Sequence, residues 1–313
     1  MSRCFVTGGA GFVGSNLVDR LLEDGHKVIV YDNFSTGHEE FLMKAKSSPN
    51  FKLIKGDLLD YGYLRDAMKN SDIVFHLAAN ADVRFGLEDP MRDLEQNTIV
   101  TSSVLEAMRK NNIKKIVFSS TGSVYGATNN FPTPENDCFP IQTSLYGASK
   151  LACEGLIQAY CEGYDFQAWI FRFVSILGER YTHGHVCDFY RKLQDNPNEM
   201  EVLGNGMQSK SYLYVQDCID AIFHLTRNTT DKINIFNLGV EDYCTVNDSI
   251  GWITKNLGLT PELKYTGGNQ GWIGDNPTIY LDVKKAEEFG WKAKVSIKDA
   301  VIKTLEYLKG FDG

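Results

Sequence analysis

The sequence predicts an α/β fold built on a doubly wound parallel sheet. Short apolar runs alternate along the chain with longer segments whose apolar residues recur at helical spacing. This alternation is typical of a parallel sheet covered by helices on both faces. A glycine-rich stretch, TGGAGFVG at residues 7–14, stands between the first apolar run and the first helical segment.

Each element follows from a local pattern. Residues 27–31 (KVIVY) form a short apolar run typical of a strand, whereas residues 12–22 have helical spacing. After about residue 178 the pattern becomes irregular, so we expect a large domain over residues 1–178 and a smaller α/β lobe over residues 179–313, segments of which can return to the large domain. The expected strands are residues 3–6, 27–31, 51–54, 72–77, 115–119 and 168–172, and the expected helices are residues 12–22, 91–109 and 145–160.

Composition limits the classes of function. With 313 residues, 43% of them hydrophobic and 23% charged, the chain has globular values. A net charge of −8 argues against a nucleic-acid or anionic-membrane partner. No apolar run approaches the ~20 residues of a membrane span. The seven cysteines are scattered, which favours reduced thiols and a cytoplasmic protein.

The glycine-rich stretch has the spacing of a dinucleotide-binding turn, so the predicted sheet is of the Rossmann type. Gly8, Gly11 and Gly14 allow a tight turn, close approach of a pyrophosphate, and packing of helix on strand. The helix N-terminus then faces the phosphates. Asp32 ends the second strand, where a carboxylate binds ribose hydroxyls and repels a 2′-phosphate. Because residues 33–40 contain no arginine, we expect NAD rather than NADP.

A tyrosine and a lysine share one face of the expected helix 145–160. Tyr146 and Lys150 stand four residues apart in the sequence YGASK. The ammonium is expected to lower the pKa of the phenol from about 10. A phenol tuned towards neutrality can take a proton from a sugar hydroxyl and return it. The motif is common by chance, and its weight comes from the glycine-rich turn in the same chain.

Several ordered motifs now point to a family. They are TGGAGFVG at residues 7–14, Asp32 with Asn33, GDL at 56–58, HLAA at 76–79, SSTGSVYG at 119–126, YGASK at 146–150, YLYVQD at 212–217 and GWIGDNP at 271–277. In this order the chain resembles the extended short-chain dehydrogenase/reductase family. Within that family it is most similar to nucleotide-sugar 4-epimerases of the UDP-glucose 4-epimerase type.

The resemblance implies an enzyme and assigns roles to its residues. Tyr146 would be the catalytic base, Lys150 would orient the nicotinamide ribose, and Thr121 would hydrogen-bond the reacting hydroxyl. Near the cofactor, Asp57 and Leu58 would reach the adenine. The implied NAD-binding residues are Gly8, Gly11, Phe12, Val13, Asp32, Asn33, Asp57, Leu58, Ala78, Ala79, Asn97, Tyr146 and Lys150.

The residues after Thr121 help to choose the reaction. Dehydratases of the family usually carry an Asp-Glu pair there, and decarboxylases a Glu, whereas this chain has Gly122 and Ser123. Neither residue can act as an acid or base near neutral pH. We therefore expect hydride transfer at C4 of the sugar. Return of the hydride would give an epimerase, and release of the ketone would give a 4-dehydrogenase. A non-catalytic NAD-binding protein is the alternative of another class.

The substrate end departs from the family pattern. Lys210 and Trp272 stand where arginines usually grip the diphosphate, and Ser175 replaces a usual asparagine. Lysine lacks the bidentate fork of arginine. These departures leave GDP-linked sugars, such as a heptose, open beside UDP-hexoses. The expected substrate-binding residues are Arg84, Thr121, Ser175, Arg180, Val186, Lys210 and Trp272.

Two further expectations concern metals and partners. His183, His185 and Cys187 alternate like metal ligands, but no fourth ligand is evident, and we expect no metal. The resemblance implies a homodimer formed by the expected helices 91–109 and 145–160. Its supporting apolar residues are Val104, Leu105, Met108, Leu151, Leu156, Ile157 and Tyr160.

Overall fold

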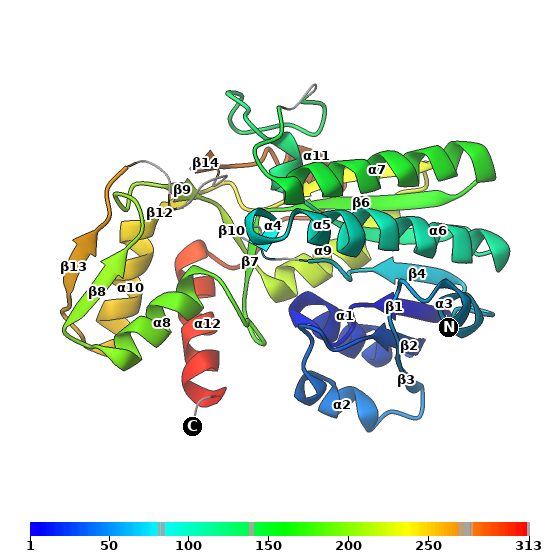
Figure 1. The fold of residues 1–313 in the computed structure, drawn as a ribbon, viewed down its shortest axis with the longest axis horizontal. Helices are drawn as coiled ribbons and strands as arrows, with labels where there is room; N and C mark the ends of the chain where they lie inside the picture. Colours follow the sequence, from blue (N-terminus) through cyan, green and yellow to red (C-terminus); the bar gives the residue numbers. More distant parts are fainter. Residues whose placement is uncertain are drawn as a thin grey trace. The chain divides into compact units, whose positions relative to one another are not determined.

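The computed structural model describes residues 1–80, 82, 85–137, 141–268, 271, 276 and 278–311, and its ribbon is drawn in Figure 1. The strands are β1 (Arg3–Thr7), β2 (Lys27–Asp32), β3 (Phe51–Lys55), β4 (Ile73–His76), β5 (Lys115–Thr121), β6 (Gln167–Phe173), β7 (Ser175–Leu177), β8 (Glu199–Val202), β9 (Ser209–Lys210), β10 (Tyr212–Tyr214), β11 (Ile233–Leu238), β12 (Cys244–Thr245), β13 (Glu262–Tyr265) and β14 (Thr278–Ile279). The α-helices are α1 (Phe12–Glu23), α2 (Met43–Lys46), α3 (Tyr61–Ala67), α4 (Phe85–Glu88), α5 (Pro90–Asp93), α6 (Val100–Lys110), α7 (Leu145–Tyr164), α8 (His185–Asp195), α9 (Val215–Asn228), α10 (Val246–Leu257), α11 (Lys284–Glu288) and α12 (Ile297–Phe311). Other helical turns are η1 (Glu39–Leu42), the π-helical turn η2 (Leu94–Ile99) and η3 (Gly122–Tyr125).

The chain divides into two compact units, which are described separately. Unit 1 comprises Met1–Val124, Ser144–Arg172 and Ile222–Phe236. Unit 2 comprises Tyr125–Thr143, Phe173–Ala221 and Asn237–Gly313. Within the described part of the chain, no helix is long and apolar enough to cross a membrane.

A seven-stranded sheet in the order β11-β6-β5-β4-β1-β2-β3 forms the centre of unit 1, and this confirms the predicted α/β fold. The pairs β1–β2, β1–β4, β2–β3 and β4–β5 are parallel. In this register Thr7 stands beside both Tyr31 and His76. Parallel strands end at one edge of a sheet, so the carboxyl ends of β1, β2, β4 and β5 lie together there.

Helices cover both faces of this sheet. On one face α6 packs beside α7, as Figure 1 shows, and α3 packs against α6. On the other face α1 meets α9, where the guanidinium groups of Arg20 and Arg227 lie 5.2 and 5.3 Å from the ring centroid of Phe223. A continuous core of fully buried side chains, among them Phe5, Val104, Phe118 and Ile157, fills the space between the sheet and α3, α6 and α7.

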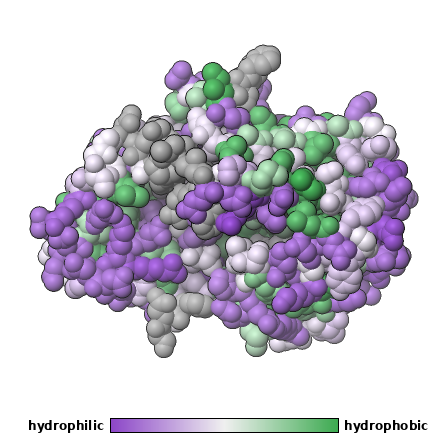
Figure 2. Space-filling model, viewed as in Figure 1, coloured by the Kyte–Doolittle hydropathy of each residue, from purple (hydrophilic) through white to green (hydrophobic). Residues whose placement is uncertain are grey.

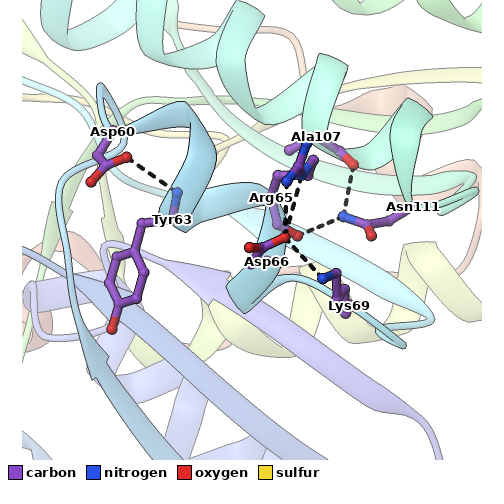
Figure 3. Close-up of polar contacts among 7 residues, drawn as sticks. All are labelled: Asp60, Tyr63, Arg65, Asp66, Lys69, Ala107 and Asn111. Carbon is purple, nitrogen blue, oxygen red and sulfur yellow. Dashed lines mark hydrogen bonds and ion pairs between the residues drawn. The ribbon is translucent and has the colours of Figure 1, made fainter.

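Helix α3 shows how local contacts fix the ends of an element (Figure 3). Asp60 caps its N-terminus by accepting the backbone N–H of Tyr63 at 3.1 Å. At the other end the Asn111 side chain donates to the carbonyls of Arg65 at 2.8 Å and Ala107 at 3.0 Å. Asn111 therefore ties the last turn of α3 to the last turn of α6.

The single helix expected over residues 91–109 is three segments. Helix α5 is followed by the π-helical turn η2, which leads into α6. A π-helical turn inserts an extra residue into the helix and is frequent at functional sites. Here it carries the buried Asn97.

The irregular sequence pattern after residue 178 corresponds to regular helices and strands in the structure. Unit 2 contains α8, α10 and α12, which pack on one another, and small sheets such as the parallel pair β7–β10. Strand β11 joins the large sheet beside β6. Glycine-containing loops between these elements hide their regularity in the sequence, because they break the simple alternation of strand and helix.

Candidate functional site

The glycine-rich turn between β1 and α1 has no room for side chains at its key positions. Gly8 has φ +69°, and a Cβ placed there would lie 2.6 Å from the backbone nitrogen of Ala78. A Cβ on Gly14 would lie 2.1 Å from the carbonyl oxygen of Gly8. Gly11 is the N-cap of α1, and no described side chain caps this N-terminus. A helix N-terminus that follows such a turn favours the binding of a phosphate.

A buried carboxylate stands at the end of β2, beside this turn. Asp32 is 8% exposed and accepts the backbone N–H groups of Ala10 at 2.9 Å and Phe34 at 2.8 Å. Burial raises its pKa, and the two hydrogen bonds oppose that shift. Next to it, the Asn33 side chain donates to Asp57 at 3.3 Å. The residues expected around the adenosine are therefore brought together.

A buried network surrounds Asn97 on η2. Its amide nitrogen donates to Ser149 Oγ at 2.8 Å and to Asp93 Oδ1 at 3.3 Å. Its amide oxygen accepts the backbone N–H of Asn80 at 2.9 Å, two residues beyond Ala78. Ser149 Oγ in turn donates to the carbonyl of Tyr146. Asn97 thus joins the segment after β4 to the first turn of α7.

Thr121, Tyr146 and Lys150 also meet in unit 1. The end of β5 carries Thr121, whose hydroxyl lies close enough to the phenol of Tyr146 on α7 to lower the pKa of that phenol. Lys150 follows one turn later, is 2% exposed, and holds its Nζ 4.1 Å from the centroid of the Phe118 ring. Ser144 begins α7 by accepting the backbone N–H of Gly147 at 3.0 Å.

Burial controls the ionisation of this pair. It raises the pKa of Tyr146 to about 12, against the lowering effect of the Thr121 hydrogen bond. It lowers the pKa of Lys150 to about 8. The prediction that Lys150 brings the Tyr146 pKa towards neutrality is therefore wrong for the protein by itself. A dry environment disfavours phenolate and ammonium alike, and spacing along a helix does not reveal it.

Sequence reasoning missed a buried ion pair that contacts Ser120, the residue before Thr121. Arg172 on β6 donates to Glu154 on α7, with Nη2 to Oε2 at 2.7 Å and Nε to Oε1 at 3.0 Å. Ser120 also donates to Glu154, at 2.5 Å. The pair stands one turn after Lys150 and joins α7 to β5 and β6. A glutamate four residues after Lys150 was the available signal, but its partner lies 18 residues away.

The expected substrate-binding residues fall into several groups. Arg84 and Trp272 lie outside the described residues. Ser175 is exposed at the start of β7, whereas Val186 is fully buried in α8. Arg180 is half-buried, with φ +70°.

Lys210 on β9, also in unit 2, lies near His185. Burial is the main reason that the pKa of His185 is lowered to about 3, and the nearby charge of Lys210 lowers it further. The ring of His185 packs 4.6 Å from that of Tyr212 and its Nε2 contacts Ser249 Oγ at 2.8 Å. Within the described residues no group of three His, Cys, Asp or Glu could hold a metal.

The sheet, the glycine turn and the buried Asp32 define a dinucleotide-binding α/β protein, in which Gly8 and Gly14 allow the close backbone packing that forms the turn expected to hold NAD. The family model for the NAD-dependent epimerase/dehydratase family matches residues 4–239. The chain belongs to that family. It is therefore an enzyme that uses NAD, as predicted.

Individual relatives agree. A putative UDP-glucose 4-epimerase of Methanocaldococcus jannaschii is 34% identical, with 97% of each chain covered. The solved UDP-glucose 4-epimerase of Thermotoga maritima with UDP-glucose is 31% identical and has a TM-score of 0.90, covering 99% of this chain and 100% of that one. The Thermus thermophilus UDP-glucose 4-epimerase complex with NAD is 30% identical, with a TM-score of 0.87 and coverage of 98% and 99%. Other relatives are named UDP-glucuronic acid decarboxylases.

Proposed function

We propose that the protein is an NAD-dependent nucleotide-sugar epimerase that acts by transient oxidation at C4, with a UDP-linked hexose as substrate. The observation that carries the proposal is that Thr121 at the end of β5 lies close to Tyr146, one turn before the buried Lys150 on α7, in the same unit as the glycine turn. Relatives that are named as UDP-glucose 4-epimerases support the choice of nucleotide and reaction. These relatives favour UDP over GDP as the nucleotide, although Lys210 stands where an arginine usually binds the diphosphate.

The chain's own residues would carry the proton and hold the reactants. Thr121 would hydrogen-bond the reacting hydroxyl, and Tyr146 would take its proton and return it to the opposite epimer. Bound NAD supplies an acceptor for the hydride and a positive charge that favours phenolate. Lys150 would bind the nicotinamide ribose, while Asp32 would bind the adenosine ribose and reject a 2′-phosphate.

Dehydration and decarboxylation are not part of the proposal. Gly122 and Ser123 follow Thr121 at the start of η3, and Ser123 uses its backbone N–H to donate to Thr121 at 3.1 Å. A glycine and a neutral hydroxyl supply no acid or base near neutral pH. For unit 2, we propose that Ser175, Arg180 and Lys210 contribute to binding of the nucleotide sugar.

We also propose a homodimer, with a corrected interface. Val104, Leu105, Met108 and Ile157 are fully buried in the core of their own chain and cannot face a partner. The exposed apolar side chains nearby are Met91, Leu94, Ile99 and Leu145, and Figure 2 shows apolar surface gathered in this region. Beside them, the exposed Ala152, Gly155 and Ala159 give α7 a smooth face on which another helix can pack closely.

Incubation with UDP-glucose or UDP-galactose tests the proposed activity. We expect each sugar to convert to the other, with unchanged mass and without free NADH. Accumulation of NADH with loss of two hydrogens from the sugar would instead show a 4-dehydrogenase. Failure of every UDP-sugar, together with conversion of a GDP-sugar, would overturn the choice of nucleotide.

A further inference from the structure

A chain of buried polar groups connects the dinucleotide turn with α7. Thr7 Oγ1 lies 2.7 Å from His76 Nδ1, and His76 Nε2 lies 3.0 Å from Thr101 Oγ1. Thr101 Oγ1 donates to Cys153 Sγ at 3.3 Å, and Cys153 Sγ donates to the carbonyl of Asn97 at 3.3 Å. Thr7, His76, Thr101 and Cys153 are at most 1% exposed.

The two ends of the chain fix the direction of every bond in it. A carbonyl only accepts, so the thiol hydrogen of Cys153 points to Asn97, and the sulfur accepts from Thr101. The Thr101 oxygen is then free to accept, which places a proton on Nε2 of His76. Burial, reinforced by the nearby charge of Lys150, lowers the pKa of His76 to about 3, so the imidazole is neutral and its Nδ1 accepts from Thr7.

At its other end the chain reaches the backbone of the cofactor turn. The backbone N–H of Ala78 donates to Thr7 Oγ1 at 3.3 Å. This same nitrogen is the atom that a side chain on Gly8 would strike. The bonds therefore run in one direction from Ala78 through Thr7, His76, Thr101 and Cys153 to Asn97.

The far end of the chain clamps the π-helical turn η2 to α7. Besides the thiol bond to its carbonyl, Asn97 donates from its side chain to Ser149 at 2.8 Å. Thr98 donates from its hydroxyl to the carbonyl of Ser149 at 3.2 Å. Ser149 and Cys153 flank Lys150 on α7, and Phe118, which supports Nζ of Lys150, lies 5.6 Å from the ring of His76.

We propose that His76, Thr101 and Cys153 are positioning residues that set the distance between the dinucleotide turn and the Tyr146–Lys150 pair. The inference rests on the proposed function. Hydride transfer depends steeply on the placement of the reacting groups, and an error of about 1 Å can cost ~10²-fold in rate. A directed chain of buried hydrogen bonds is suited to hold such a distance.

Four variants test the proposal. Thr101→Val and Cys153→Ala each break the chain with little change in volume, and Cys153→Ser restores a donor and an acceptor. Cys161→Ala is the matched control, because Cys161 is also fully buried on α7 but is not part of the chain of hydrogen bonds. Thermal melting and circular dichroism establish that each variant is folded before its activity is compared.

With UDP-glucose as the probe, we expect Thr101→Val and Cys153→Ala to lower kcat about tenfold while KM changes by no more than about twofold. Cys153→Ser should recover most of the rate, and Cys161→Ala should keep it. Equal losses in Cys153→Ala and Cys161→Ala, or no recovery in Cys153→Ser, would overturn the inference.

Calorimetry with NAD separates this inference from the proposed function. If the unaltered protein converts no UDP-sugar, the proposed function fails. The chain of buried hydrogen bonds still reaches the cofactor turn through Thr7 and Ala78. We then expect Thr101→Val and Cys153→Ala to bind NAD several-fold more weakly than Cys161→Ala does. Equal affinities in all of these variants would reject the role of the chain.

Discussion

Tyr146 is the side chain on which the proposed chemistry depends most. Burial raises the pKa of its phenol to about 12, and the nearby Thr121 hydroxyl opposes that shift. The protein by itself therefore keeps the phenol protonated. In the proposed mechanism the positive charge of bound NAD would favour deprotonation of Tyr146 and would so couple proton transfer to NAD binding.

Replacement of that phenol gives the first prediction. Tyr146→Phe removes the proton acceptor but keeps the ring, so we expect NAD binding to persist while the rate falls at least ~10²-fold. Single-turnover formation of NADH with UDP-glucose measures the loss. Near-full activity in this variant would refute the assignment of the base.

His76 gives a prediction about pH. The unfolded chain protonates this histidine near its usual pKa of 6.5, whereas burial holds the pKa at about 3 in the folded protein. The unfolded state therefore binds more protons between these values, and the free energy of unfolding falls as the pH falls. The expected contribution is about 1.4 kcal/mol per pH unit within this window.

Denaturant unfolding between pH 7 and 4 measures this dependence. The variant His76→Gln should be less stable at pH 7, because it disrupts the chain, but its stability should fall less steeply with acid. An equally steep fall in the variant would show that His76 does not remain neutral in the folded protein.

At the scale of elements, the cap of α3 is a local determinant of stability. Asp60→Ala removes the acceptor of the Tyr63 N–H and should cost about 1 kcal/mol. Asp66→Ala, on the same helix, removes only exposed ion pairs with Lys69 and Arg65 and should cost less. Urea unfolding of both variants checks the order, and the opposite order would contradict the role of the cap.

The strands and glycine turn could be predicted because each is encoded locally. Residues 27–31 form an apolar run, and the structure has β2 there with Asp32 at its end. The π-helical turn could not be predicted, because it depends on bonds from Asn97 to Asn80 and Ser149, which are 17 and 52 residues away. Burial of Tyr146 is likewise a property of the folded chain, and so the pKa expected from helix spacing was wrong.

At the scale of the whole molecule, the exposed apolar positions near α7 predict a dimer. A chain of 35.2 kDa should double its mass in light scattering at micromolar concentrations. Ile99→Lys and Ala152→Arg should weaken the dimer, because each places a charged side chain on the proposed face. Met43→Lys, which places the same charge at another exposed apolar position, on α2, is the control. A monomeric mass for the unaltered protein would reject the interface.

Unit 2 was the least predictable part of the molecule. Its helices α8, α10 and α12 are amphipathic, but they follow one another through loops that contain Gly204, Gly206 and Gly258, each with positive φ. Such loops do not reveal which helices pack together. The roles of Ser175 and Lys210 in binding the nucleotide sugar are proposals.

Transient oxidation at C4 is the central claim, and the fate of the C4 hydrogen tests it most directly. The experiment uses UDP-glucose that carries deuterium at C4, with the unaltered protein and its bound NAD, and follows the product by nuclear magnetic resonance and mass spectrometry. We predict UDP-galactose that retains deuterium at C4, because the same hydride leaves and returns. Epimerised product that has exchanged the C4 deuterium for solvent hydrogen, or a keto-sugar released with deuterated NADH, would contradict the account.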